Sequence, residues 1–279
     1  MPVKDVLLPL VGDPSPSAAA IEACVAAATH LGARITGFVV EQDVPVRPQV
    51  MIWPDLEAGA QPGVAPEANG SPDLLSAFRG AASRLGARAD GRLHKVPPDT
   101  ITAAVAEQAR YSDLTLVPVK SHDSRSERLV EALIFESGRP LLLCPEAHAG
   151  ELRPKIENVV IAWDRSARAA RAVADAMPIL QAANSVRLIT VTDDKTDAVT
   201  RAGTALVDHL REHGVYTAFE TVRIDGSSIG KVLGSWANAH DIDAIVMGAY
   251  HHSRLNEIVW GGVTKTVIAE PPCWVMMSH

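Results

Sequence analysis

Residues 4–11 read KDVLLPLV and residues 157–164 read ENVVIAWD, and these two short apolar runs decide the fold. Each has the length and apolar character of a strand that is buried on both faces of a sheet. An alanine-rich stretch with a helical pattern follows each run, at 17–31 in the first case and at 166–183 in the second. Strand followed by helix, with short connections, predicts parallel strands with helices on both faces of the sheet.

The same order of elements continues through both halves of the chain. Three further pairs of apolar runs follow: 34–40 with 186–191, 113–119 with 243–249, and 140–144 with 272–276. A repeat of this length indicates that the chain contains two copies of one fold. The sequence therefore predicts an α/β protein with two tandem doubly wound five-stranded parallel sheets, in domains at 1–147 and 154–279. A polar linker, bracketed by Pro145 and Pro154, joins them.

The two copies differ in length. Leu7 pairs with Val160, 153 positions further on, whereas Leu116 pairs with Val246, 130 positions further on. The first copy is therefore longer by 23 residues, mostly at 41–72, where six prolines occur. Because proline interrupts both helices and central strands, we expect a long surface loop or flap at 41–72.

Bulk composition excludes several classes of function. The net charge is −7, from 26 basic and 33 acidic residues, whereas general nucleic-acid binders carry a basic excess. Aromatic residues make up 4% of the chain, which disfavours a stacking platform for single strands. No stretch is apolar for long enough to cross a membrane. We therefore expect neither a nucleic acid nor a membrane as a partner.

The cysteines and the amino-terminal segment indicate the compartment. Cys24, Cys144 and Cys273 lie far apart in the sequence and form no CxxC pair, a pattern typical of buried thiols in a reducing cytoplasm. The opening residues, MPVKDVLLP, lack the basic segment and the long apolar run of a signal peptide. We expect a cytoplasmic protein without disulfides or a metal site.

Candidate ligand-binding residues follow the strands of the second half, because doubly wound sheets bind ligands beyond the carboxyl ends of their strands. Asp164 ends the first strand, where its carboxylate can accept hydrogen bonds from a sugar hydroxyl or a base amine. Gly261 and Gly262 precede a helix whose amino terminus favours an anion. Positive charge is available nearby from four side chains: His251, His252, Arg254 and Lys265. In outline this is the geometry of an adenine-nucleotide site.

The tandem five-strand pattern, the segment GAYHHSRLNEIVWGGVT at 248–264 and the closing strand PCWV at 272–275 resemble the universal stress protein family. The resemblance is strong over 155–279 and weak over 1–147. Nucleotide-binding members of that family carry Gly-x2-Gly-x9-Gly-(Ser/Thr) after the fourth strand and an aspartate at the end of the first. Gly248 and Gly261 match the first and third glycines, and Asp164 matches the aspartate.

The resemblance implies a stress-response or regulatory protein that binds an adenine nucleotide such as ATP, with or without Mg²⁺, in its second half. The binding residues that it implies are Asp164, Val191, Gly248, His251, His252, Arg254, Gly261, Gly262, Val263 and Thr264, with Val191 at the backbone contact to adenine. Two departures weaken the match. His251 replaces the second glycine, and Gly262 lacks the expected hydroxyl, although Thr264 stands two residues later.

The first half departs further from the family pattern. Val11 stands where the aspartate would be, and the loop at 120–126 contains no glycine. A negative Asp123 at the phosphate position would repel a phosphate. We therefore expect this half to support the assembly rather than to bind nucleotide. Because family members pair through their fifth strands, the resemblance also implies that the two halves pack as an intramolecular pseudo-dimer.

Several alternatives remain open. Asp164 could be a turn or helix-cap residue, Gly261 and Gly262 could be a simple turn, and the two histidines could be a solvated loop. The chain could instead be a module that has lost nucleotide binding and docks a protein partner through the flap, or a slow ATP hydrolase. It could be a monomer with an internal pseudo-dimer or a homodimer. No catalytic motif is evident, so we expect binding rather than committed catalysis.

Overall fold

The fold comes from a computed structural model that describes residues 2–12, 15–42, 71–193, 197–224, 226–249 and 262–279. The elements of the first half are β1 (Asp5–Val11), α1 (Ala18–His30), β2 (Arg34–Gln42), α2 (Ser71–Arg84), β3 (Ala89–Val96), η1 (Pro98–Thr100), α3 (Ile101–Ala109), β4 (Leu114–Val119), α4 (Ser124–Glu136), β5 (Leu141–Pro145) and η2 (Glu146–His148). Those of the second half are β6 (Asn158–Ala162), α5 (Ala167–Ala182), β7 (Ser185–Val191), α6 (Asp197–Glu212), β8 (Phe219–Val222), α7 (Ile229–Ala239), β9 (Ala244–Gly248), α8 (Gly262–Ala269) and β10 (Trp274–Ser278).

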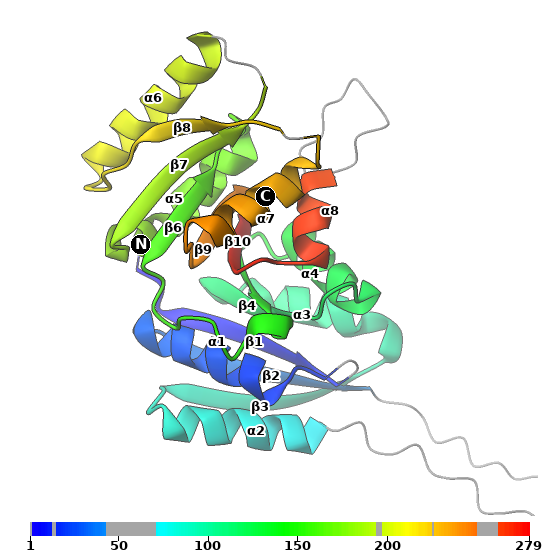
Figure 1. Ribbon diagram of the computed structural model, residues 1–279. Coiled ribbons are helices and arrows are strands. Elements are labelled where there is room, and N and C mark those ends of the chain that lie inside the picture. Colours follow the sequence, from blue (N-terminus) through cyan, green and yellow to red (C-terminus); the bar gives the residue numbers. More distant parts are fainter. Residues whose placement is uncertain (1, 13–14, 43–70, 194–196, 225, 250–261) are drawn as a thin grey trace, which may run out of the picture.

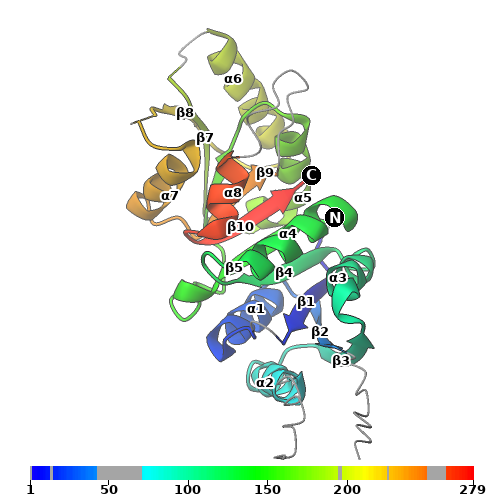
Figure 2. The same ribbon diagram turned by 90° about the vertical axis from the view of Figure 1, so that its right-hand side faces the viewer.

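The described strands form one ten-stranded sheet in the order β3-β2-β1-β4-β5-β10-β9-β6-β7-β8 (Figure 1). Within each half the strands are parallel, as the alternation of strand and helix predicts. The halves join through β5 and β10, which pair antiparallel and set Leu143 opposite Val275 (Figure 2). The α/β fold with two tandem five-stranded units, and their pairing as a pseudo-dimer, are therefore confirmed.

Burial explains why the fifth strands pair. Every residue of β5 and of β10 is buried. Either strand alone would leave an apolar sheet edge with unpaired N–H and C=O groups, which favours association with another strand. Pairing the two edges within one chain satisfies both, and the resulting sheet continues through the whole molecule.

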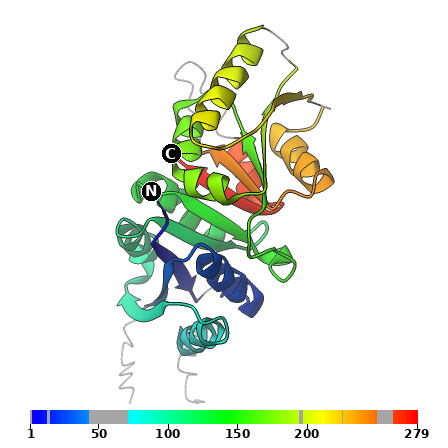
Figure 3. The ribbon, with the colours of Figure 1, turned by 90° about the vertical axis from the view of Figure 1, so that its left-hand side faces the viewer.

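Helices cover both faces of this sheet, and two apolar clusters fill the space between. Helices α1, α2, α5 and α6 contribute to one cluster, and α3, α4, α7 and α8 to the other. Opposite views show these layers with the sheet between them (Figures 2 and 3). Along β1, Leu8 and Leu10 join the first cluster and Leu7 joins the second, as expected because side chains alternate along a strand.

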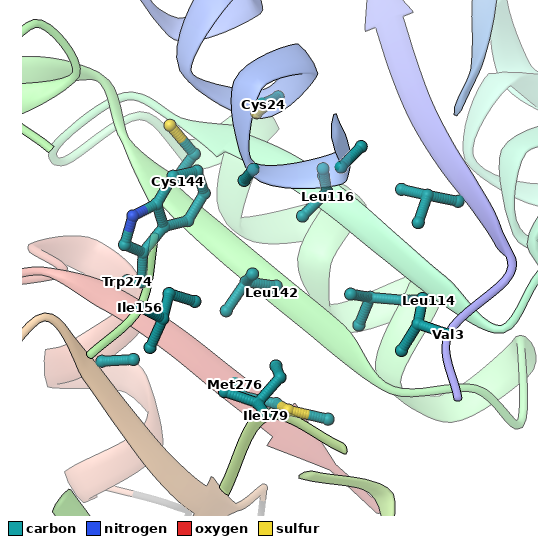
Figure 4. Close-up of a cluster of buried hydrophobic side chains, with 14 of the residues drawn as sticks. Val3, Cys24, Leu114, Leu116, Leu142, Cys144, Ile156, Ile179, Trp274 and Met276 are labelled. Carbon is teal, nitrogen blue, oxygen red and sulfur yellow. The ribbon is translucent and has the colours of Figure 1, made fainter. Parts of the chain in front are cut away.

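The first cluster extends across the boundary between the halves. Leu142 of β5 lies in it together with Trp274 and Met276 of β10 (Figure 4). The Trp274 indole is fully buried and donates its N–H to the Arg153 carbonyl, 3.1 Å away. Cys24 and Cys144 lie in the same cluster, which confirms that they are buried thiols.

The repeat is also visible in two equivalent hydrogen-bonded anchors. The Asp113 carboxylate accepts from the backbone N–H groups of Lys4 (2.8 Å) and Asp5 (3.1 Å) at the start of β1. Asp243 repeats this at the start of β6, accepting from the N–H groups at 157 (2.9 Å) and 158 (2.8 Å). Each carboxylate therefore ties the beginning of a first strand to the beginning of the fourth.

Helix α5 partly departs from the expected pattern. The spacing of its apolar residues predicts an inward stripe at Ala170, Val173, Ala174 and Met177. Val173 is buried and Met177 packs against the core, as predicted, but Ala170 and Ala174 are exposed. Three other alanines, at 169, 172 and 176, are buried instead. Ser166, directly before the helix, caps it and accepts a hydrogen bond from the Ala169 N–H at 3.0 Å. Pro178 lies inside the helix, which ends at Ala182, about one turn later.

Most of the expected flap, 43–70, lies outside the described residues, and its two ends belong to β2 and α2. Among the described residues, no helix combines the length and hydropathy that a membrane span needs.

Candidate functional site

A cavity of about 290 Å³ lies at the carboxyl ends of β6, β7 and β9, beside the first turn of α8. Six predicted binding residues line it: Asp164, Val191, Gly248, Gly262, Val263 and Thr264. The other four, His251, His252, Arg254 and Gly261, lie outside the described residues. Lys265, expected near phosphates, is exposed and does not line the cavity. Residues separated by up to 100 positions in the sequence are thus brought to one end of the sheet.

Asp164 is held in place by the start of α5. Its Oδ1 accepts a hydrogen bond from the Ser166 N–H at 2.9 Å, while the Ser166 hydroxyl caps the helix. Arg165 between them has a left-handed backbone, with φ of 67°. The alternative of a turn residue is therefore observed for Asp164. It does not exclude a ligand contact, because an ionised carboxylate has about four acceptor positions.

Gly248, the first glycine of the expected motif, and Gly262, which stands where the motif has Ser or Thr, have different physical roles. A Cβ at Gly248 would lie 2.6 Å from the Ala169 backbone nitrogen and 2.8 Å from the Arg168 carbonyl carbon. The close packing of α5 on β9 thus requires glycine at 248, whether or not a ligand binds. A Cβ at Gly262 would meet no heavy atom of the described residues within 4 Å, so their packing leaves this position open to a side chain.

The walls of the cavity are mainly apolar, and several of the side chains that form them are not among the predicted binding residues. Leu233 and Met247 are buried, and Ile229 is 36% exposed. The pattern of α7 predicts that Ile229 and Leu233 share one helix face, but the distance of that face from α8 is a tertiary property. Gly230 sets this distance, since a Cβ there would lie 2.8 Å from the Thr266 Cβ.

Trp163 forms another part of the lining, next to Asp164. Its backbone N–H donates to the Ile189 carbonyl (2.8 Å), and its carbonyl accepts from the Thr190 hydroxyl (2.6 Å). These bonds join the end of β6 to β7. The indole Nε1 is buried without a hydrogen-bond partner among the described residues. An unpaired buried donor of this kind costs about 1–3 kcal/mol.

A second cavity, of about 400 Å³, occupies the equivalent place in the first half. It lies at the ends of β1, β2 and β4, beside the first turn of α4. Val11 lines it, at the position that corresponds to Asp164. The loss of the family pattern in this half therefore changes the lining of the cavity, while the cavity itself persists.

Asp123 has a structural role beside this second cavity. Its carboxylate caps α4, accepting from the Ser126 N–H (2.7 Å) and hydroxyl (2.9 Å). Burial by itself would raise the pKa of Asp123, but these bonds and the charge of Arg125 outweigh it and lower the pKa below its usual value. The amino terminus of α4 is thus already occupied by an internal anion. That the first half does not bind nucleotide stays a prediction.

Comparison with known proteins agrees with this architecture. Residues 155–279 match the model of the Universal stress protein family. No curated protein matches the chain. A universal stress protein from Archaeoglobus fulgidus superposes with a TM-score of 0.67 at 14% identity, over 98% of this chain and 95% of that one.

Two structures from Pseudomonas aeruginosa are also similar. A provisional universal stress protein gives a TM-score of 0.61 at 14% identity, over 99% of this chain and 93% of that one. A functionally unknown protein gives 0.60 at 13% identity, over 99% and 92%. At these identities the likeness shows the tandem fold and nothing about ligands.

Proposed function

Residues 155–279 form a domain of the universal stress protein family, and from this premise we propose that the second half is a regulatory module that binds an adenine nucleotide such as ATP, with or without Mg²⁺. The observation that carries the proposal is the cavity beside α8, which gathers six residues that the sequence marks for that role. Its position at the carboxyl ends of parallel strands is the usual one for a ligand in a doubly wound sheet.

Each part of the nucleotide has a complementary surface in this cavity. The flat base fits between the apolar side chains of Leu233 and Met247, with the backbone of Val191 at the strand end for its polar edge. The Asp164 carboxylate, anchored through Oδ1, accepts a ribose hydroxyl through its remaining lone pairs. The phosphates lie toward the first turn of α8, where Gly262 leaves room for them and the helix dipole favours negative charge.

The lining favours binding over catalysis. Among the described lining residues, Asp164 is the only ionisable side chain, and its carboxylate is engaged with the Ser166 N–H. Hydrolysis of a phosphoanhydride needs a group that positions or deprotonates the attacking water, and the described lining offers no second one. The proposed role is therefore a nucleotide-dependent conformational or partner switch, not committed hydrolysis.

Calorimetric titration with ATP and Mg²⁺ tests the proposal. Two variants separate ligand contact from local structure: Asp164→Asn keeps the Oδ1 acceptor for the Ser166 N–H but loses the charge, and Asp164→Ala loses both. A hydrogen bond to a charged group contributes about 1.5–3 kcal/mol, so we expect the affinity to fall by roughly 10–100-fold. The matched control is Asp208→Ala, an exposed carboxylate on α6 that pairs with Arg211.

Two results would contradict the proposal. One is the absence of binding heat from the native protein at millimolar ATP. The other is equal affinity in the native protein, the Asp164→Asn variant and the Asp208→Ala variant. Release of ADP during prolonged incubation would instead favour the slow hydrolase that the sequence leaves open.

A further inference from the structure

We propose that the cavity of the first half binds a small organic carboxylate that has an apolar body and one hydrogen-bond donor, and that it does not bind an adenine nucleotide. This site is separate from the one proposed for nucleotide in the second half. Its volume, about 400 Å³, lies within the range of cavities that hold small metabolites.

Two helix amino termini face this end of the sheet, and one of the chain's own carboxylates lies at each of them. Asp123 caps α4 through the Ser126 N–H. Glu146, which directly follows β5, accepts from the backbone N–H of Ser17, the N-cap residue of α1, at 3.2 Å. A phosphate chain would have to displace these carboxylates or lie against them, and like charges in a cavity repel. With Val11 in place of the aspartate, the ribose also loses its acceptor.

The cavity nevertheless retains positive charge, on the first turns of α4. Arg125 and Arg128 both line it, three residues apart on the same helix. The charge of Arg125 acts on Asp123, whereas Arg128 makes no hydrogen bond or ion pair with any residue in the described ranges. A guanidinium group binds a carboxylate through two parallel hydrogen bonds. Arg128 is therefore the anchor for a single carboxylate.

The other walls define the remainder of the ligand. Val11, Ile101, Val117 and Leu129 supply an apolar surface that borders the arginines. An apolar ligand body buried there is stabilised by about 25 cal/mol per Å² of surface removed from water. The ligand is thus amphipathic, with its charge at the α4 end.

Glu146 adds a carboxyl group to the lining of the cavity. Its side chain is half-buried and lines the cavity. Burial raises the pKa of Glu146 above its usual value, although the bonds from Ser17 and the charge of Lys120 oppose this. A carboxyl group in such a place accepts a hydrogen bond from a ligand hydroxyl or ammonium group, and it disfavours a second negative charge. The ligand therefore carries one carboxylate and one donor group, a hydroxyl or an ammonium.

Saturation-transfer NMR on the full chain tests this, with 4-hydroxyphenylacetate, phenylalanine, phenylacetate and ATP as probes at millimolar concentration. We expect transfer to 4-hydroxyphenylacetate or phenylalanine, and at least tenfold weaker binding to the Arg128→Gln variant. The matched control is Arg201→Gln, an exposed arginine on α6 in the other half. Glu146→Gln should reduce the preference for the two donor-carrying probes over phenylacetate.

The outcomes separate this proposal from the one for the second half. Asp164→Asn should leave the carboxylate signals unchanged and affect only ATP. The carboxylate proposal is overturned if none of the carboxylate probes shows transfer, if Arg128→Gln and Arg201→Gln behave alike, or if Arg128→Gln abolishes the ATP signal. A circular dichroism melt of each variant shows whether a lost signal reflects unfolding.

Discussion

Replacing Gly248 by alanine tests whether packing, rather than ligand binding, requires glycine at the end of β9. The new Cβ would lie 2.6 Å from the Ala169 nitrogen and 2.8 Å from the Arg168 carbonyl carbon, both in the first turn of α5. Contacts below 3.0 Å are essentially never tolerated, and here the opposing atoms are backbone. The helix therefore has to move away from the sheet, which loosens the packing of α5 on β9 and β10.

Overpacking of this kind costs about 1–3 kcal/mol, and the lower chain entropy of alanine in the unfolded state returns a part of it. A net loss of about 2 kcal/mol would lower the melting temperature by roughly 4–8 °C. The assay is thermal unfolding without nucleotide, followed by circular dichroism. Gly262→Ala is the matched control, because its Cβ would meet no atom of the described residues within 4 Å and alanine favours a helix. Equal melting temperatures for the two variants would refute the packing argument.

Three further predictions follow from the same contacts. Gly262→Ser supplies a hydroxyl at the start of α8, where the described residues leave open space, so we expect ATP to bind about fivefold more tightly in calorimetry. Unchanged affinity would count against phosphates at this turn. Burial raises the pKa of Glu146 above 4.5, so the folded state binds this proton more tightly than the unfolded state, and the resulting stabilisation is lost as the pH rises through the pKa of the folded state. In urea unfolding, the free energy of unfolding of the native protein relative to Glu146→Gln should therefore be higher at pH 4 than at pH 7. The same difference at both pH values would contradict this. Burial raises the pKa of Cys273 to about 12 and also raises the pKa of Cys24. At pH 8 a thiol-specific disulfide reagent should therefore label the protein only after denaturation, and rapid labelling of the native protein would contradict the burial of these thiols.

Together, the two cavities suggest how two copies of one fold in the same chain could bind two different ligands. The cavities share their place in the sheet, but Asp164 in one corresponds to Val11 in the other, and the first turn of α8 at Gly262 corresponds to the arginine-bearing first turn of α4. Because β5 and β10 join the halves in one continuous sheet, a change in one half can shift the other. This coupling would require each ligand to favour a different arrangement of the halves.

Local pattern was sufficient for much of the architecture. The apolar runs at 4–11 and 157–164 form β1 and β6, and Ser166 and Ser228, each directly before a helical stretch, cap α5 and α7. The rule that ligands bind at strand ends also placed Asp164 with Gly248 at one cavity. These features depend on side-chain spacing and hydrogen-bonding chemistry within a few residues, which the sequence states directly.

Other features depend on contacts between distant segments. The residue spacing in α5 predicts a helix but not which of its faces points inward, because alanine is common on both the buried and the exposed face of a helix. In the structure Ala169 is buried and Ala170 is exposed. Glu146 accepts a hydrogen bond from the backbone N–H of Ser17, the N-cap residue of α1, which is 129 residues away in the sequence. The requirement for glycine at 248 arises only because α5 lies against β9. By itself the sequence determined the strands, their helices and the end of the sheet at which the two cavities lie. Only the tertiary structure decided which atoms meet there, because those distances are set by how whole elements pack.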